Sequence, residues 1–378
     1  MTISASRGVA PDGLARHSVA LLLEHQHASG SFVACPAFPV YDFAWLRDGA
    51  FCAHALDLVG ETEAAARFHA WVARTVERQR PRALAAIETI VTGGTPAPGA
   101  MLPARYTLEG EPEADGADPW PNFQLDGYGT WLWALGRHLE GRSLPDELEP
   151  AVRLAADYLA VAWPLRCWNW WEELDGGEHA ATLGAIAAGL AAASRLLADE
   201  CYADVARAIE SRLAGRFRRD GHYVRGAADA RVDGSLLSLG IPFGVVAPDG
   251  AAMRATVEAV RRDLVGPTGG VRRYLGDTYY GGGEWVLLTC WLALYDELDQ
   301  RRAEVERGRT WVCERAVAGE LPEQETSAPQ DAAMVEPWVE RWGPPASPLL
   351  WSHAMFVILE ATVAAGRGAA SPESNLRS

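Results

Sequence analysis

The stretch from 168 to 173 reads Trp-Asn-Trp-Trp-Glu-Glu, so two adjacent carboxylates end a tryptophan-rich run. A turn-prone Asp-Gly-Gly follows at 175–177, and a long apolar segment comes next. A carboxyl group packed against indole rings loses hydration, which raises its pKa and lets it act as a general acid near neutral pH. The alternative is a pair of acidic residues that begin a helix. A catalytic interpretation requires a second carboxylate elsewhere, as a base or a nucleophile.

The segment after this stretch, Ala180–Ala193, is the longest apolar run of the chain. It is too short for a membrane span, and we interpret it as a buried helix. With 378 residues, 49% of them hydrophobic, the chain has material for a large core. A formal net charge of −16 argues against nucleic acid and an anionic membrane surface as partners. The pattern leaves the oligomeric state open.

Six scattered cysteines, without a Cys-x-x-Cys pair, are typical of reduced core residues rather than of a disulfide framework or a metal site. The N-terminus has no hydrophobic signal segment, so we expect a cytoplasmic protein. The nine histidines show no metal-ligand pattern, and His25 and His27 are expected to face solvent. We therefore predict no cofactor and no metal.

Helical periodicity dominates the chain, and no convincing run of alternating strands is present. Every second predicted helix tends to be apolar and rich in alanine and glycine, whereas several of the others have one apolar stripe. This alternation predicts an all-α fold, an (α/α)6 barrel with an inner and an outer ring, as one domain over 1–378 with about 367–378 as a loose tail. The predicted helices are 11–28, 47–59, 62–79, 124–140, 146–162, 178–197, 200–217, 232–239, 250–263, 283–298, 300–318 and 350–366.

The connections that lead into the inner helices are long and hold many tryptophans, tyrosines, arginines and acids. In a double ring they would all open at the same end, where long loops on a rigid scaffold commonly carry function. We therefore expect a pocket rimmed by aromatic side chains and carboxylates. These connections are 29–46, 80–123, 163–177, 264–282 and 319–349.

Two of these connections lead into a predicted helix whose first turn contains charged residues. Arg47 and Asp48 stand side by side, where arginine can donate to neighbouring sugar hydroxyls and aspartate can accept from them. A helix-capping aspartate with an ion pair explains the same residues equally well. Trp120 and Asp126 flank the start of the next inner helix, and core packing and the helix dipole explain them as simply.

The last two connections contain further candidates. Three glycines follow Tyr279 and Tyr280, which allows a close approach of backbone to ligand. The stretch lacks the Walker pattern and its lysine, so it is not a phosphate loop. The stretch 319–325 contains the acids Glu320, Glu323 and Glu325, and their spacing does not single one out.

Taken together, the five stretches resemble glycoside hydrolase family 15, the glucoamylase family. Its blocks Tyr-x-x-x-Trp-x-Arg-Asp, Trp-x-x-x-Gln-x-Asp-Gly, Leu-Trp-Glu-Glu, Arg-Tyr-x-x-Asp-x-Tyr-x-Gly and a late Glu-Gln before a Trp-Ser-His helix have counterparts here in the same order. The resemblance extends from about residue 12 to 366 and implies an (α/α)6 barrel. One departure is Glu284, which stands before Trp285 where many members have proline, so aglycone specificity stays open.

The resemblance implies roles for individual residues. Glu172 would be the general acid and Glu323 the general base of an inverting reaction, for which the carboxyl groups are expected roughly 6.5–9.5 Å apart. Arg47 and Asp48 would hold the hydroxyls of the terminal glucose, and Tyr41 would lie near the base. The substrate-binding residues that it implies are Tyr41, Trp45, Arg47, Asp48, Trp120, Glu173, Arg273 and Trp285.

The function that we expect is an exo-acting, inverting α-glucosidase that releases β-glucose from short α-glucosides, such as isomaltose and malto-oligosaccharides. A small oligosaccharide would then be its partner. Trehalose is an alternative substrate within the family. A non-catalytic sugar-sensing module and an isomerase on the same type of barrel are alternatives from other classes. An isomerase would rely on paired histidines, and only His179 and His353 lie in or beside the long loops.

Overall fold

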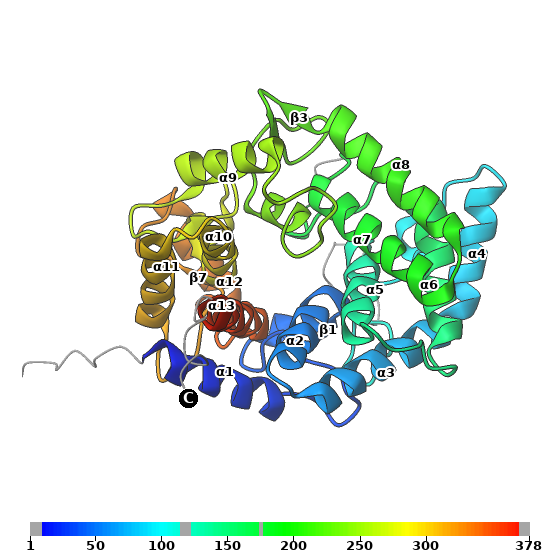
Figure 1. Ribbon diagram of the computed structural model, residues 1–378, viewed down its shortest axis with the longest axis horizontal. Helices are drawn as coiled ribbons and strands as arrows, with labels where there is room; N and C mark the ends of the chain where they lie inside the picture. The colour runs from blue at the N-terminus through cyan, green and yellow to red at the C-terminus, as the bar shows by residue number, and fades with distance from the viewer. Residues whose placement is uncertain (1–9, 114–121, 174–176, 370–378) are drawn as a thin grey trace, which may run out of the picture.

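A computed structural model describes residues 10–113, 122–173 and 177–369, and it shows helices arranged in two concentric rings (Figure 1). The inner ring closes on itself, because each member contacts the next and the last contacts the first. Its members are α2 (Leu46–Leu58), α5 (Asp126–His138), α7 (Ala180–Leu197), the short 3₁₀ helix η3 (Gly234–Leu239), α10 (Val286–Leu298) and α13 (Leu350–Ala369). This closure confirms the predicted (α/α)6 barrel.

The outer ring lies against the inner one, and each outer helix except α1 contacts the inner helix that precedes it in the chain. Helix α3 packs on α2, α6 on α5 and α8 on α7, while α1 packs on α13 at the other end of the chain. The outer helices are α1 (Pro11–Glu24), α3 (Thr62–Arg78), α6 (Glu149–Ala162), α8 (Glu200–Arg216), α9 (Ala251–Leu264) and α11 (Arg302–Arg315).

The small residues of α7 explain how the inner helices approach so closely. A Cβ atom on Gly189 would collide with the backbone of Gly129 in α5, and one on Gly129 would collide with Ala185. Helix α7 is long and apolar enough to cross a membrane by composition, but 78% of that segment is buried inside the barrel. The apolar run therefore forms a core helix, as predicted.

Aromatic side chains fill the middle of the inner ring. Phe51 of α2 stacks on Trp351 of α13 with ring centroids 5.3 Å apart, and it meets Trp291 of α10 edge-on at 5.4 Å. Trp170 packs on Trp291 at 5.8 Å, which ties the tryptophan-rich stretch to this core. Offset and edge-to-face ring pairs add to the stabilisation that burial provides. The barrel is therefore packed at its centre rather than open.

Several predicted boundaries were wrong. The interval 80–123, predicted as a loop, contains α4 (Arg80–Val91), and the interval 319–349 contains α12 (Val335–Trp342). Helix α4 was missed because only Ala83 and Ala86 are buried on it, which leaves almost no apolar stripe. Helix α13 continues to Ala369, so the predicted tail begins too early. The predicted helix 232–239 is the 3₁₀ helix η3, and the first helix ends at Glu24.

Pairs of very short antiparallel strands hold the long connections together. Strand β1 (Ala44–Trp45) pairs with β2 (Arg105–Tyr106), with Trp45 opposite Arg105. Strand β6 (Glu284–Trp285) lies between β5 (Val271–Arg272) and β7 (Gln324–Glu325), with Trp285 opposite Gln324. Two-residue strands leave no alternating pattern in a sequence. The remaining short elements are β3 (Arg218–Arg219), β4 (His222–Tyr223), η1 (Pro39–Tyr41), η2 (Pro98–Ala100), η4 (Tyr279–Gly281) and η5 (Ala332–Met334).

All six cysteines are free thiols. Five of them are buried, as expected for core residues, whereas Cys201 at the start of α8 is exposed. The histidines predicted to face solvent, His25 and His27, are half-buried, because the chain turns back after α1 and Gln26 forms a bridge with Phe32.

Candidate active site

A cavity of about 480 Å³ lies at the end of the barrel where the long connections meet. This volume lies within the range of small-molecule sites, about 300–1,000 Å³. Helices α2 and α13 contribute their first turns to it, as the double-ring pattern predicts. Its lining includes Phe38, Tyr41, Trp45, Arg47, Asp48, Trp168, Trp170, Trp171, Glu172, Glu173, Arg273, Tyr279, Trp285, Glu323, Trp338, Arg341, Trp342 and Trp351.

Asn169 organises the turn that carries the first carboxylate. Its side-chain Oδ1 accepts hydrogen bonds from the backbone N–H groups of Trp171 (2.9 Å) and Glu173 (3.0 Å). Its backbone oxygen accepts from the N–H of Glu172 (3.0 Å) and from the side-chain amide of Gln124. This network holds Glu172 at a φ of 61°, a left-handed conformation that costs a non-glycine residue about 1–3 kcal/mol. Such strain persists only where the surroundings enforce it, and it is frequent at active sites.

Burial dominates the electrostatics of Glu172. It raises the pKa of this carboxyl group to about 7, and the positive charges of Arg105 and Arg47 oppose the rise. The direction of this shift agrees with the expectation from the sequence, and its cause is burial. Arg105 belongs to β2, and its guanidinium lies 4.8 Å from the ring centroid of Trp45, across the β1–β2 pair.

Glu323 supplies the second carboxyl group of the cavity, and this one is buried. The hydroxyl of Tyr41 donates a hydrogen bond to its Oε1 (3.1 Å), while its Oε2 makes no hydrogen bond to the described residues. Burial raises the pKa of Glu323 to about 7, against the opposing charge of Arg273. The structure thus distinguishes Glu323 from the neighbouring acids, because Glu320 is exposed and Glu325 pairs with Arg315 (3.9 Å).

His353 fixes the segment that carries Glu323. Its Nε2 accepts from the backbone N–H of Leu321 (2.9 Å), so its Nδ1 carries the proton that it donates to Ser18 (2.8 Å). Burial lowers the pKa of this histidine to about 3, which keeps it neutral. The side chain therefore joins α1 and α13 to the loop, a structural role that leaves it no part in an isomerase pair.

The Arg47–Asp48 pair lies on the cavity wall at the start of α2. Arg47 forms ion pairs with Asp48 (3.2 Å) and with Asp126 of α5 (3.1 Å), and its guanidinium lies 5.0 Å from the ring centroid of Trp351. Burial raises the pKa of Asp48 to about 6, although Arg47 opposes the rise. Asp126 is completely buried and does not line the cavity, so it positions Arg47.

A second ionic cluster surrounds Glu173. Its carboxylate accepts from the hydroxyl of Tyr274 (2.7 Å) and pairs with Arg225 (2.8 Å) and Arg273 (3.3 Å). Arg273 also forms a bidentate pair with Asp277 at 2.7 and 2.6 Å. Because these contacts occupy most of its carboxylate, Glu173 orients Arg273 on the cavity wall as well as lining the cavity itself.

The cavity brings together all the predicted site residues that the structure describes, while Trp120 lies outside the described residues. Glu284 points away from the cavity. Its carboxylate accepts hydrogen bonds from the backbone of Thr268 (3.2 Å) and Gly270 (2.7 Å), and from the Thr268 hydroxyl. The residue therefore anchors the turn before β5. Aglycone specificity would then depend on other side chains.

Sequence reasoning assigned no individual role to several residues of the cavity. The hydroxyl of Tyr279 lies 2.8 Å from that of Tyr41, beside Glu323. Trp338 and Trp342 of α12 form part of the wall, and Trp338 donates to the backbone oxygen of Thr278 (2.9 Å). In the sequence, only their position in the last long connection indicated that Trp338 and Trp342 lie near the cavity. The indole N–H groups of Trp170, Trp285 and Trp351 on the wall make no hydrogen bond to the described residues.

The sequence and the fold of this chain are similar to those of known glycoside hydrolases. Residues 8–360 match the family described as Glycosyl hydrolases family 15. The isomaltose glucohydrolase of Kribbella flavida is 39% identical over 355 residues, which cover 92% of this chain and 91% of that protein. A variant glycosidase solved in complex with glucose is 38% identical, with a TM-score of 0.88 over 93% of this chain and 96% of that chain. A bacterial glucoamylase complexed with acarbose, 20% identical, shares the fold with a TM-score of 0.71 over 94% of this chain and 56% of that chain.

Proposed function

The chain belongs to glycosyl hydrolase family 15, and we propose that it is an exo-acting, inverting hydrolase that releases β-glucose from the non-reducing ends of short α-glucosides. At the coarser level it is a glycoside hydrolase of the glucosidase or glucoamylase type. One observation carries the finer proposal. The carboxyl groups of the half-buried Glu172 and the buried Glu323 line one cavity together with the Arg47–Asp48 pair.

The two carboxyl groups influence each other, since the charge of Glu172 raises the pKa of Glu323. With both pKa values near 7, ionisation of Glu172 favours retention of the proton by Glu323. Near neutral pH the pair therefore holds one proton. A protonated acid and an ionised base are the two forms that glycoside hydrolysis requires at the same time.

We assign the base to Glu323. The hydrogen bond from Tyr41 favours its ionised form, and its free Oε2 can accept a proton from water. Water attacks the anomeric carbon and gives its proton to Glu323, while Glu172 protonates the glycosidic oxygen of the departing sugar. The C–O bond to the leaving group breaks as the new bond forms on the opposite face, so the configuration inverts. This role predicts a carboxyl separation of roughly 6.5–9.5 Å, with room for the water.

The terminal glucose is proposed to lie against α2 and α13. Arg47 and Asp48 offer a donor and an acceptor for adjacent hydroxyls. The indole N–H groups of Trp170 and Trp351 are further donors, with no partner among the residues that the structure describes. The apolar ring surfaces are suited to pyranose faces. Beyond the carboxyl pair, the aglycone would meet Trp285, Arg273 and α12.

Short substrates are favoured by two observations. Helix α12 brings Trp338, Arg341 and Trp342 onto the cavity wall, which limits the space for a long chain. The relative from Kribbella flavida is an isomaltose glucohydrolase, so isomaltose is the first substrate to try.

The test is product analysis by ¹H NMR during hydrolysis of isomaltose, maltose and trehalose. We expect isomaltose to be cleaved fastest and β-glucose to accumulate before mutarotation equilibrates the anomers. Initial release of α-glucose would contradict the inverting assignment. Preferential cleavage of trehalose would make the protein a trehalase, and binding of glucose without hydrolysis of any α-glucoside would favour a sugar-sensing module.

A further inference from the structure

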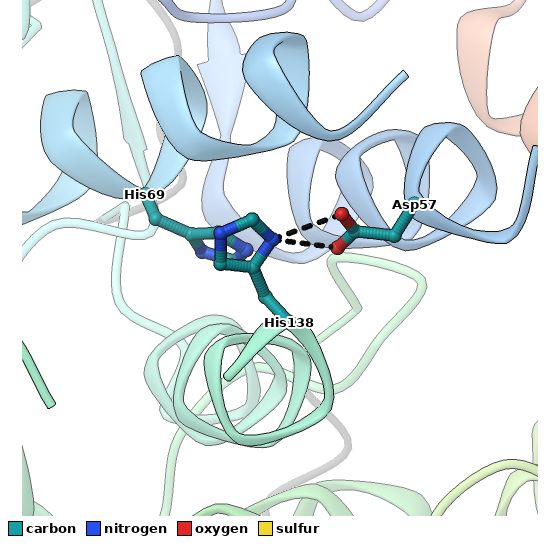
Figure 2. A group of neighbouring side chains, drawn as sticks. All are labelled: Asp57, His69 and His138. Atoms are coloured by element: carbon teal, nitrogen blue, oxygen red, sulfur yellow. Dashed lines mark hydrogen bonds and ion pairs between the residues drawn. The ribbon is translucent and has the colours of Figure 1, made fainter. Parts of the chain in front are cut away.

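A second cluster of polar side chains lies at the opposite end of the inner helices. Asp57 belongs to the last turn of α2, His138 to the end of α5, and His69 to the middle of the outer helix α3 (Figure 2). Helix α2 begins at the active-site cavity with Arg47. With a rise of about 1.5 Å per residue, Asp57 is about 15 Å further along the helix axis. The cluster is therefore separate from the catalytic carboxyl groups.

Two of the three side chains contact each other directly. Nδ1 of His138 lies 2.9 and 3.0 Å from the two carboxylate oxygens of Asp57. The ring of His69 lies beside that of His138, with centroids 4.9 Å apart. One ligand atom from each of the three residues can be chosen so that all lie within 4.8 Å of one another.

His69 is the unusual member of the cluster. It is 1% exposed, and neither of its ring nitrogens forms a hydrogen bond to the described residues. A buried polar group without a partner costs about 1–3 kcal/mol, so most such groups in proteins have one. The missing partner is either a hydrogen-bond acceptor for the imidazole N–H or an electron-pair acceptor for the unprotonated ring nitrogen. A cation fits the second requirement and would also suit the carboxylate of Asp57.

We propose that Asp57, His69 and His138 bind a divalent transition-metal ion, with Zn²⁺ the preferred occupant. Two imidazoles and one carboxylate are a common zinc ligand set, whereas Mg²⁺ and Ca²⁺ prefer oxygen ligands alone. In a tetrahedral site with bonds of about 2.0–2.1 Å, donor atoms lie roughly 3.4 Å apart. Small side-chain rotations therefore suffice to close the site. A water molecule would take the fourth position beside Asp57, whose side chain is 15% exposed.

One further histidine lies near the cluster on α2. His54 lies one turn before Asp57 on α2, but it packs edge-on against Trp133 at 4.8 Å and is not one of the three ligands. The bound ion would join α2, α3 and α5, and two of these helices carry Arg47, Asp48 and Asp126 at their other ends. The ion would hold these helices together and would not contact the reacting atoms.

The experiment uses the full chain without a histidine tag, freed of metal by chelation and dialysis. Isothermal titration with ZnCl₂ should give one site, and saturating Zn²⁺ should raise the melting temperature. The variants His69→Gln and Asp57→Asn should each weaken Zn²⁺ binding by about 100-fold, since even outer-shell changes cost about 10–100-fold. His54→Gln is the matched control, a buried histidine of the same region whose replacement should leave the affinity unchanged.

X-ray absorption on the zinc-loaded wild type tests the site without any variant. We expect a first shell of nitrogen and oxygen atoms at about 2.0–2.1 Å, with the multiple-scattering signature of two imidazoles. Absence of saturable Zn²⁺ binding, or equal affinity in wild type and His69→Gln, would overturn the proposal. A first shell without two imidazoles, or loss of binding in His54→Gln, would overturn the ligand assignment.

Discussion

At Glu172 the backbone and the side chain are both held in unfavourable states. The residue has a φ of 61°, and partial burial raises the pKa of its carboxyl group to about 7. The sequence predicted the second property, because neighbouring tryptophans were visible in it. It could not predict the first, which follows from hydrogen bonds that Asn169 and Gln124 make only in the folded chain.

Replacing either carboxyl group should stop turnover and spare binding. Glu172→Gln and Glu323→Gln keep the side-chain shape but remove the acid or the base, so kcat should fall by at least about 10²–10⁴-fold. Glucose affinity, measured by calorimetry, should change little. Glu320→Gln and Glu325→Gln are the matched controls from the same loop and should stay active. Near-normal kcat in Glu323→Gln would place the base elsewhere.

The same burial predicts a pH-dependent stability. The pKa of Glu172 is about 7 in the folded protein and 4.5 ordinarily, so the folded state disfavours its ionised form. Ionisation of this carboxyl group therefore lowers the free energy of unfolding. The loss is absent below pH 4.5, grows as the pH rises to 7, and is complete above pH 7, at up to about 3 kcal/mol. Glu172→Gln should therefore unfold at a higher temperature than wild type at pH 8, with a smaller difference at pH 5. Calorimetry at both pH values measures this, and an equal difference at both would contradict it.

Among the elements, the inner helices could be predicted and the loop structure could not. Helices such as α7 and α10 are apolar on nearly every face and stood out in the sequence. Helices α4 and α12 bury few residues, and β1, β2, β5, β6 and β7 have two residues each. Their positions depend on tertiary pairing rather than on local pattern. Those pairings place Gln324, the residue after Glu323, opposite Trp285, which sequence spacing could not indicate.

Helix α12 should govern the aglycone side of the cavity. Trp338 packs edge-on against Tyr279 at 5.0 Å and anchors the helix through Thr278. Trp338→Ala should raise KM for isomaltose by about tenfold, equivalent to about 1.4 kcal/mol of lost binding, while glucose inhibition changes little. Steady-state kinetics with both ligands measures this. Trp163→Ala, in a tryptophan outside the cavity, is the control, and equal losses for glucose and isomaltose would argue against an aglycone role.

Glu284 should matter for stability and not for linkage choice. Its carboxylate satisfies the N–H groups of Thr268 and Gly270 and the Thr268 hydroxyl. Glu284→Ala leaves these donors, of which that of Gly270 is buried, without their carboxylate partner and should destabilise the protein by about 3 kcal/mol. Thermal unfolding measures the loss, with exposed Glu320→Ala as the control. The ratio of rates on isomaltose and maltose should stay as in wild type, and a changed ratio would contradict this assignment.

On the scale of the whole molecule, the ring closes only when α13 packs against α2 and α10. The twelve-helix alternation was enough to predict this architecture, because each apolar helix needs cover on most sides. Only folding brings the ends of the chain together, through the contact between α1 and α13. Helix α1 leads toward the cavity and α13 leads away from it, so Pro11 and the end of α13 lie at the same end of the barrel.

This closure predicts that the chain tolerates circular permutation. A variant that joins the two ends and opens at Gly141, an exposed glycine with no neighbour where a Cβ would be, keeps both rings intact. It should fold, melt within a few degrees of wild type and retain kcat/KM for isomaltose. A permutant opened at Asn169 would break the turn that holds Glu172 and should lose activity. An insoluble or inactive Gly141 permutant would show that chain order, and not only ring closure, is required.

The tryptophan lining of the cavity has one more consequence. Eight of the chain's 15 tryptophans contribute to it, namely Trp45, Trp168, Trp170, Trp171, Trp285, Trp338, Trp342 and Trp351. Indole emission depends on polarity and on nearby quenching groups, and here most of the emitters of the protein surround a single ligand site. The protein thus carries its own optical reporter, and a sugar that displaces water from the cavity should change its ultraviolet fluorescence without any attached dye.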